Sequence, residues 1–430
     1  MKRMVGRARP NRPDLAIVAI VLALTGVGLV LVYSASFAIG LNDFGNPNYF
    51  IVRQVVGTVA GLALMVFLAR MNYEVLRRWS PLILAGALLG LALVLVPGIG
   101  HASNGAARWV RLGPLPPVQP SEFAKLAMVI YIAAWLAAKG EQVKQFSLGV
   151  VPFVMMVGLV GGLIMLEPDM GTFLVIALTT GTMFFVAGAS IAHVLTLAAS
   201  GLAGGVVLIA VEGYRMERLL SFLHAEKDPA GKGYQILQLL IALGSGGVRG
   251  LGLGESRQKF FYVPGAHTDG IFAIAGEELG FVGAAALIVL FAALTARGFR
   301  AAVRARDKFG FLLAVGVTCW IAYQAVINIA GVTRLLPLTG IPLPFLSYGS
   351  SAMTATLAAV GVLLSVSRYP REGSYLERQR RARAARVEAS SGSGAAAAPP
   401  TDGRADRAWR VSSTRRYERP AVPAFLRREQ

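Results

Sequence analysis

The stretch 260–280 places a polar triplet directly before an apolar segment. His267, Thr268 and Asp269 end a loop rich in turn formers, and the apolar helix predicted after them still carries two glutamates. A carboxylate at the mouth of a hydrophobic segment is costly to desolvate, so it has either a function or a buried partner. Asp269 is therefore the best candidate for a general base. The alternative is that Thr268 or Asp269 only caps the following helix.

A second candidate pair lies at the start of another apolar segment. Pro120 suits the first turn of a helix, and Glu122 and Lys125 are three residues apart, so they share one helical face. Two interpretations stay open. The pair neutralises itself, or Lys125 offers a cation to an anionic headgroup while Glu122 holds it in place.

Two short polar segments add further candidates. Trp109 beside Arg108 is either an interfacial aromatic residue or a stacking surface for a sugar ring. Asp169 follows Glu167 before a tight turn, where two acids can bind a cation or cap the next helix.

Arginines and broken backbone mark two other regions. Arg215 and Arg218 can pair with lipid phosphate, because an arginine fork matches two phosphate oxygens. Three prolines between residues 337 and 344 interrupt any helix before Ser347, which opens the last apolar segment. Irregular backbone at membrane depth is tolerated when it is buried or lines a water-filled cavity. These breaks predict a cavity that opens outward.

Searches for common catalytic and metal motifs are negative. The four histidines form no HExxH or zinc spacing, and the sequence has no GxSxG elbow. The glycine-rich run 244–254 lacks the spacing of a phosphate loop, so we interpret it as a close-packed turn.

The composition of the chain indicates that membrane-spanning helices position these residues. The chain is 55% hydrophobic and only 15% charged over 430 residues, which is typical of a polytopic membrane protein. The net charge of +19 lies mainly in tails and certain loops, where membrane topology explains it, so no nucleic-acid partner is predicted. The single cysteine, Cys319, excludes an internal disulfide.

About ten transmembrane helices are predicted, in an all-α fold, because an open sheet cannot satisfy its backbone in lipid. Each apolar run is long enough, within tilt, for a hydrocarbon core of about 30 Å. The runs are 15–39, 51–68, 82–96, 121–138, 148–166, 172–187, 191–211, 271–296, 311–329 and 346–365.

Charge asymmetry between loops predicts the orientation. Basic clusters alternate with less basic loops, so both termini are predicted to be cytoplasmic. Four polar connections then face outward, and the largest, 212–269, lies between the seventh and eighth helices. The domains we expect are a basic cytoplasmic leader (1–13), a transmembrane domain (14–370) and a disordered basic cytoplasmic tail (371–430).

Several motifs, in order, carry a family resemblance. They are NGAARWVRLGPL, QPSEFAKLA, YRMERLLSFL, GYQILQLLIALGSGG, GLGESRQKFFYVPGAHTDGIFAIAGEELGFVG and PLTGIPLPFLSYGSS. Across residues 14–368 the chain resembles the SEDS family of peptidoglycan polymerases, the FtsW and RodA type. Gly265 and Gly270 depart from the glutamate and phenylalanine that the family usually has around the HTD motif, and Ser350 from its usual glycine.

The resemblance implies a multi-pass protein of the bacterial cytoplasmic membrane that polymerises lipid II on the outer face. Asp269 would be the catalytic base, taking the proton from the acceptor C4 hydroxyl as undecaprenyl pyrophosphate leaves. The implied cation is a side chain or a divalent ion (Mg²⁺ or Mn²⁺); no organic cofactor is expected, and metal ligands are unassigned. The predicted substrate-binding residues are Trp109, Arg108, Glu122, Lys125, Arg215, Arg218, His267, Thr268 and Ser347, with Asp169 as the predicted cofactor-binding residue.

The implied partners are undecaprenyl-linked glycan, a class B penicillin-binding protein, and other membrane proteins of the division or elongation machinery. The NGAARWVRLGPL run and the long basic tail favour the FtsW-like division branch over the RodA-like elongation branch. The alternative from another class is a flippase that carries lipid II between leaflets, since broken helices and intramembrane charges fit a transporter too. A weaker alternative is a non-catalytic scaffold, for which Asp269 would be dispensable.

Overall fold

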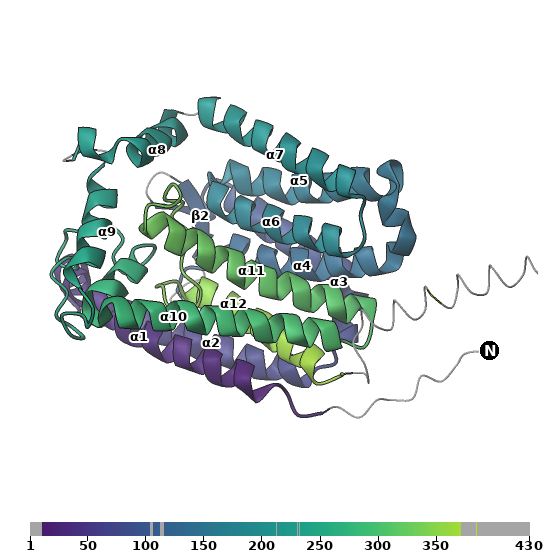
Figure 1. The fold of residues 1–430 in the computed structure, drawn as a ribbon, viewed down its shortest axis with the longest axis horizontal. Helices are drawn as coiled ribbons and strands as arrows, with labels where there is room; N and C mark the ends of the chain where they lie inside the picture. Colours follow the sequence, from purple (N-terminus) through teal and green to yellow (C-terminus); the bar gives the residue numbers. More distant parts are fainter. Residues whose placement is uncertain are drawn as a thin grey trace, which may run out of the picture. The chain divides into compact units, whose positions relative to one another are not determined.

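A computed structural model describes residues 11–103, 106–111, 116–211, 213–229, 231, 233–370 and 384 (Figure 1). The chain divides into two compact units, Met1–Glu377 and Arg378–Gln430. The first unit holds all of the elements discussed below. The leader up to residue 10 and the tail expected from residue 371 lie outside the described residues, apart from residue 384, so those two domain predictions stay predictions.

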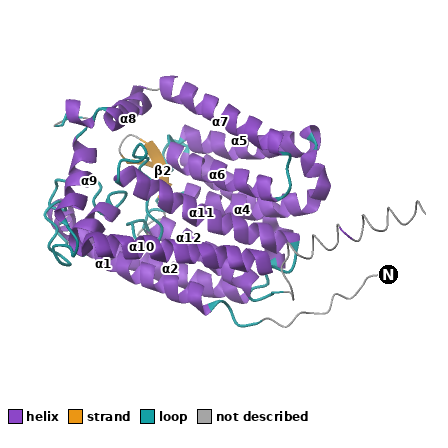
Figure 2. Cartoon of the chain, in the orientation of Figure 1, coloured by secondary structure: helices purple, strands orange, loops and turns teal. Residues whose placement is uncertain are grey.

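The described residues form twelve α-helices, three short helical turns and one pair of strands (Figure 2). The helices are α1 (Leu15–Phe44), α2 (Tyr49–Arg70), α3 (Glu74–Val94), α4 (Pro120–Lys139), α5 (Val151–Leu166), α6 (Met170–Val186), α7 (Ile191–Val211), α8 (Gly213–Leu223), α9 (Tyr234–Ser245), α10 (Ile271–Arg304), α11 (Lys308–Val332) and α12 (Ser350–Ser367). The short turns are η1 (Gly140–Lys144), η2 (Phe146–Val150) and η3 (Ala225–Lys227), and the strands are β1 (Gly100–Ser103) and β2 (Ala106–Val110).

The membrane-spanning helices match the apolar runs of the sequence. Within the described residues, nine helices are long and apolar enough to cross a membrane, and α6 is a shorter apolar helix of 17 residues. Together they overlap the ten predicted spans, which confirms an all-α polytopic membrane fold. Helices α8 and α9 lie in the large connection 212–269, and Figure 1 shows them at the end of the bundle opposite to the start of α1.

The first outward loop contains an element that the sequence reasoning did not predict. Strands β1 and β2 pair antiparallel, with His101 opposite Trp109. A two-stranded hairpin is possible here because it lies outside the hydrocarbon, where its edges need no second sheet. The dipeptide Asn104-Gly105 between the strands is a strong hairpin signal, and it could have revealed this element.

Close helix packing uses small residues. A Cβ atom added to Gly57 of α2 would lie 2.6 Å from the Cα atom of Ser350 in α12. On the same interface, the Thr354 hydroxyl donates a hydrogen bond of 2.9 Å to the Gly57 carbonyl. In lipid, where apolar surface gives no driving force between helices, such backbone approach is a main source of association.

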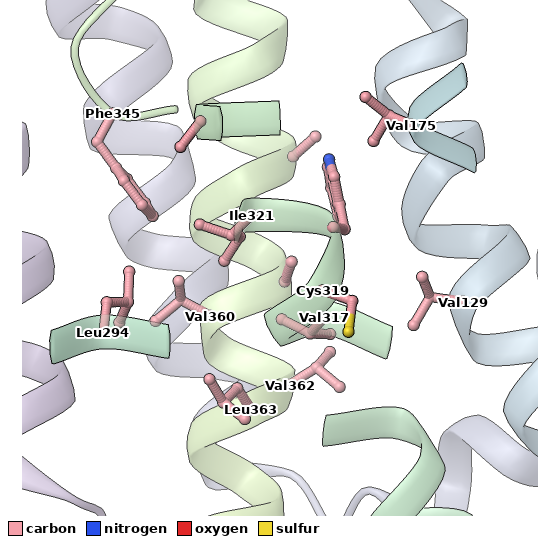
Figure 3. Close-up of a cluster of buried hydrophobic side chains, with 14 of the residues drawn as sticks. Val129, Val175, Leu294, Val317, Cys319, Ile321, Phe345, Val360, Val362 and Leu363 are labelled. Atoms are coloured by element: carbon pink, nitrogen blue, oxygen red, sulfur yellow. The ribbon is translucent and has the colours of Figure 1, made fainter. Parts of the chain in front are cut away.

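Helix α11 lies at the centre of the bundle and packs against α4, α6, α10 and α12. The core around it includes Cys319 and Ile321 from α11, Val129 from α4 and Val360 from α12 (Figure 3). Cys319 is a free, buried thiol. Because other helices surround α11, its polar side chains must find their hydrogen-bond partners inside the protein.

Helix α10 is kinked at Gly280, where φ is 68° and ψ is −170°. The glycine-rich turn packs into this kink: Leu251 N donates to Glu277 O (2.9 Å), and Phe281 N donates to Gly247 O (2.9 Å). A Cβ atom at Gly280 would lie 2.2 Å from Gly250 N, so only glycine fits. The interpretation of residues 244–254 as a close-packed turn is confirmed.

Candidate active site

The Asp269 loop is held from behind by helix α11. The Asn328 amide donates two hydrogen bonds, to Asp269 O (2.9 Å) and to Ile341 O (2.8 Å). The Thr268 hydroxyl lies 3.1 Å from Asp269 Oδ1, and the carboxylate is only partly buried. The N-cap of α10 is Gly270, which makes no side-chain capping bond, and the capping alternative for Thr268 and Asp269 stays a prediction. The carboxylate is therefore anchored through its backbone at the outer end of the bundle.

His267 is held between two aromatic rings. Its ring centroid lies 4.7 Å from that of Phe50 and 5.5 Å from that of Tyr348, and the His267 carbonyl accepts a hydrogen bond of 2.8 Å from Tyr348 N. Burial lowers the pKa of His267 to about 4, so the imidazole is neutral at pH 7. His267 thus packs the loop and adds no positive charge beside Asp269.

Gly265 lets the loop fold back on its own carboxylate. Its φ is +68°, in the left-handed region, and a Cβ atom there would lie 2.4 Å from Asp269 Oδ1. At this position, where the chain departs from the family pattern, a side chain would strike the Asp269 carboxylate or force the loop to move.

Glu122 and Lys125 form a fully buried pair on α4. Lys125 Nζ lies 2.9 Å from Glu122 Oε1 and 2.8 Å from Gln324 Oε1. The Trp320 indole donates to the same Gln324 oxygen at 2.8 Å, and Lys125 Nζ lies 5.2 Å from the centre of the Trp320 ring. Both charged side chains are 1% exposed. The ammonium is thus held inside the bundle, and its predicted role in binding substrate stays a prediction.

One face of α11 connects this buried pair to the Asp269 loop. Trp320, Gln324 and Asn328 follow at four-residue spacing, which places them along one side of the helix. Gln324 also donates to Pro342 O (2.9 Å), close to the Ile341 carbonyl that Asn328 binds. Gln324 and Asn328 were not among the predicted site residues. The signal that could have found them is a stripe of amides in an otherwise apolar span.

The hairpin is tied to the turn between α5 and α6. Arg108 Nε donates to Glu167 O (2.9 Å), and its Nη2 donates to Pro168 O. Asp169 is the N-cap of α6, with Oδ1 accepting from Thr172 N at 3.0 Å. The capping interpretation of Asp169 is therefore confirmed. Arg108 brings Trp109, which is partly buried, and Asp169 to the same end of the molecule.

Glu167 is an unusual residue within that turn. It is completely buried, and within the described residues neither carboxylate oxygen has a hydrogen-bond partner. Burial raises the pKa of Glu167 to about 8; the charge of Asp169 raises it further and Arg108 opposes this. Mg²⁺ commonly uses one or two carboxylates and takes its other ligands from water and phosphate. Glu167 supplies an unpartnered carboxyl for such a site, whereas both Asp169 oxygens already accept hydrogen bonds from Thr172. The described residues hold no group of three or more His, Cys, Asp or Glu placed to bind a metal.

The Ser347 hydroxyl is bound by the backbone of its own turn. It accepts a hydrogen bond of 2.7 Å from Leu343 N, and the residue is buried. The side chain of Gln54 holds the neighbouring backbone by donating to Ser347 O (3.2 Å) and accepting from Gly349 N (2.9 Å). Ser347 therefore shapes the turn before α12, and its predicted contact with substrate is untested.

Arg53 is a cation near the loop that the sequence reasoning missed. Its guanidinium lies 3.6 Å from the centre of the Tyr49 ring, one turn away on α2. Burial raises the pKa of Tyr348 to about 12, and the charge of Arg53 opposes that shift, so Arg53 lies within electrostatic reach of the aromatic pocket around His267. It offers positive charge on the Asp269 side of the bundle.

Behind the loop, the two glutamates of α10 are bound by donors. Glu278 Oε1 accepts from Ser34 Oγ (2.5 Å) and from Lys259 Nζ (3.1 Å). Glu277 accepts from Ser256 Oγ (2.5 Å) and from Arg257 N (3.0 Å). Buried donors therefore bind one oxygen of Glu278 and both oxygens of Glu277, and Lys259 is a second buried cation that the sequence reasoning did not single out.

The remaining predicted residues lie on α8. Arg215 and Arg218 belong to that helix, but their side chains lie outside the described residues, so their predicted phosphate contacts stay predictions. The structure thus brings Asp269, Thr268 and His267 into one loop and connects the loop through α11 to Glu122 and Lys125.

This arrangement defines a class of protein: a multi-pass membrane protein with a backbone-anchored carboxylate and buried cations at one end of a helix bundle. The chain belongs to the FtsW/RodA/SpoVE family, described as cell cycle protein, whose model matches residues 15–372. It is a multi-pass protein of the cytoplasmic membrane.

Named relatives and solved structures agree with this assignment. The chain is 46% identical to "Stage V sporulation protein E" of Bacillus subtilis, covering 84% of this chain and 99% of the relative. It is 42% identical to "Probable peptidoglycan glycosyltransferase FtsW" of Trichlorobacter lovleyi, covering 82% and 93%. Rod shape determining protein RodA of Thermus thermophilus matches with TM-score 0.61 and 30% identity, covering 84% of this chain and 98% of that one.

One further solved structure contains a similar chain. It is described as "Structural coordination of polymerization and crosslinking by a peptidoglycan synthase complex", and the similar chain has TM-score 0.68 and 29% identity. The match covers 83% of this chain and 98% of that chain.

Proposed function

We propose that the chain is a peptidoglycan glycosyltransferase that polymerises lipid II at the outer face of the cytoplasmic membrane, with Asp269 as the general base. Relatives named as peptidoglycan glycosyltransferases support the activity. The observation that carries the site is the Asn328 bond to the Asp269 backbone, which fixes a partly exposed carboxylate at the outer end of the bundle.

In the proposed reaction, the acceptor C4 hydroxyl gives its proton to Asp269 and attacks the anomeric carbon of the donor. A C–O bond to the sugar forms as the bond to undecaprenyl pyrophosphate breaks, with inversion at the anomeric carbon. A general base must lie within hydrogen-bond reach of that hydroxyl, about 2.6–3.2 Å. Arg53 offers positive charge on this side, and fixed charge of this kind stabilises a leaving anion.

We propose a divalent cation, Mg²⁺ or Mn²⁺, as the cofactor, with no organic cofactor. Glu167 and Asp169 would hold it, Glu167 after losing its proton and Asp169 in place of its bond from the Thr172 hydroxyl, and the cation would neutralise charge on the leaving pyrophosphate. The test is polymer formation after treatment with EDTA and gel filtration. Full activity without added metal would contradict the proposal, and restoration by Mn²⁺ or Mg²⁺ would support it.

The decisive experiment replaces Asp269 by Asn, which keeps the shape and removes the base. We expect glycan polymer from purified lipid II to fall about 10²–10⁴-fold in Asp269→Asn and Asp269→Ala. Glu255→Gln is the matched control, because Glu255 is an exposed carboxylate in the same outer connection. Near-normal polymer from both Asp269 variants would remove this residue from its role.

The proposal also includes a partner protein and a role in one cellular process. A similar chain lies in a peptidoglycan synthase complex, which supports a class B penicillin-binding protein as partner and further division proteins around it. We favour the FtsW-like division branch, with RodA-like elongation as the alternative. Depletion followed by microscopy separates the two, because filaments indicate division and rounded cells indicate elongation.

The flippase alternative predicts a different placement of charge. A carrier needs polar groups along the whole path, whereas Lys125 lies only five residues into α4, about 8 Å from its outer end at 1.5 Å per residue. Asp269 and Lys259 lie in the outer connection before α10. The buried charges of the site therefore gather at one end, as a polymerase requires.

A further inference from the structure

A pocket with no part in the proposed reaction opens at the cytoplasmic end of the bundle. It lies where the chain enters α1, where α10 ends and where α12 ends, and its cavity volume is about 270 Å³. Four arginines line it, Arg12, Arg297, Arg300 and Arg304.

Backbone contacts build the walls of this pocket. Asn11 N donates a hydrogen bond of 2.8 Å to Arg368 O, which holds the entering chain against the end of α12. Ala305 and Pro370 form an antiparallel bridge, which joins the end of α10 to the segment after α12. The three segments are thus fixed to each other, and the pocket does not depend on loose loops.

The charges in the pocket are unbalanced. Asp14 is its one acidic lining residue, so the four arginines leave three positive charges in excess. Asp14 is already engaged, because it caps α1 by accepting from Ala16 N (3.0 Å) and lies 3.5 Å from Arg297 Nη1. Within the described residues, Arg300 and Arg304 have no acidic partner within 4.0 Å, and both are exposed. Like charges that line one pocket repel each other, and an anion would relieve that repulsion.

The position of the pocket indicates which anion it meets. It lies level with the start of α1 at Leu15 and the end of α12 at Ser367, which mark the cytoplasmic surface of the membrane. Beyond the kink at Gly280, α10 continues from residue 281 to Arg304, about 36 Å at 1.5 Å per residue, so its last turn reaches past a hydrocarbon core of about 30 Å. Basic pockets at this depth face the anionic headgroups of the inner leaflet.

We propose that this pocket is a binding site for the headgroup of an anionic phospholipid of the cytoplasmic leaflet. The guanidinium groups of Arg300 and Arg304 pair with the phosphodiester, which arginine forks match at two oxygens. Arg12 and Arg297 flank the headgroup from the leader and from the preceding turn of α10. The site lies at the opposite end of the bundle from Asp269 and is independent of the proposed activity.

The test is native mass spectrometry of the full-length chain in detergent, titrated with phosphatidylglycerol and, separately, with phosphatidylcholine. The double variant Arg300→Gln/Arg304→Gln is compared with Arg77→Gln/Arg78→Gln. The second pair makes the same charge change at two exposed arginines of α3, on the same side and outside the pocket. Thermal unfolding of each variant checks that it is folded.

We expect wild type to bind one phosphatidylglycerol more tightly than phosphatidylcholine. The pocket variant should lose about tenfold in affinity, and the control less than about twofold. Equal loss in both variants would show a general charge effect and overturn the proposal. No loss in the pocket variant, or equal binding of phosphatidylcholine, would do the same. Displacement of the lipid by millimolar inorganic phosphate would show a site for free anions, which also overturns it.

Discussion

Two buried glutamates at the outer end of the bundle have opposite surroundings. Glu278 in the kink region of α10 accepts hydrogen bonds from Ser34 and Lys259, so one of its carboxylate oxygens has two donors. Glu167 in the turn before α6 is equally buried, and neither of its oxygens has a donor in the described part of the chain. The difference separates a buried carboxylate that a cation neutralises, so that it holds helices together, from a buried carboxyl group that has neither a cation nor a hydrogen-bond donor of its own.

The largest expected effect comes from removing one partner of the buried Lys259–Glu278 pair. Lys259→Met leaves the Glu278 carboxylate buried without its cation, which we expect to reduce the free energy of unfolding by about 3–5 kcal/mol. Thermal unfolding in detergent measures this. Lys144→Met is the control, because Lys144 pairs with Glu141 on the surface and should change stability by less than about 1 kcal/mol.

A double replacement tests whether the unpaired buried charge causes the loss of stability in Lys259→Met. Lys259→Met combined with Glu278→Leu removes both buried charges, and such replacements are often neutral. We expect it to recover more than half of the stability that Lys259→Met loses. If the double variant is no more stable than the single one, Lys259 acts through packing, and the contrast with Glu167 does not rest on charge.

The next effect comes from releasing the Asp269 loop from α11. Asn328→Leu removes the bonds to Asp269 O and Ile341 O, so we expect about 1–3 kcal/mol of lost stability and about 10–100-fold less polymer. Thr356→Val is the control, since it removes only a bond within α12, to Ala352 O. Equal activity losses in the two variants would mean that the Asn328 bonds have no special role.

Gly265 tests the Asp269 loop with a smaller change. Gly265→Ala adds a Cβ atom 2.4 Å from Asp269 Oδ1 and places alanine at a φ of +68°, which costs about 1–2 kcal/mol. Gly254→Ala has the same kind of backbone cost, at a φ of +86°, but nothing within 4 Å of the new atom. We expect both variants to lose similar stability and only Gly265→Ala to lose polymerisation. Similar activity in both would show that the Asp269 carboxylate tolerates displacement.

The smallest effect is the pH dependence of the Glu167 turn. Because its pKa is raised to about 8, the folded protein holds a proton that the unfolded chain releases above the ordinary value of 4.5. Stability should therefore fall as pH rises from about 4.5 to 8. Glu167→Gln should remove this loss and unfold about 2 °C higher than wild type at pH 8, with no gain at pH 4. A pH-independent difference would mean that the carboxyl does not titrate in this range.

The fold could be predicted from the sequence where hydrophobicity alone decides it. Each of the ten apolar runs became a helix, because lipid leaves an uncharged run no other way to satisfy its backbone. The β1–β2 hairpin was missed, since outside the membrane local turn chemistry decides and Asn104-Gly105 was not weighed. The two predicted end domains lie mostly outside the described residues.

The site could be predicted where its residues are neighbours in sequence. The pairing of Glu122 with Lys125 and the cap at Asp169 follow from spacing alone. Ser34 and Glu278 are 244 residues apart, so no local pattern could pair them. The same holds for Asn328 and Asp269, whose bond depends on where α11 lies in the bundle.

The amide stripe of α11 has one more consequence. Successive residues of an α-helix are about 100° apart around its axis, so a rotation by a single residue would carry Trp320, Gln324 and Asn328 away from their partners together. The positions of the buried Lys125 ammonium and of the Asp269 loop therefore both depend on one orientation of α11. Any movement that loosens one of them must loosen the other.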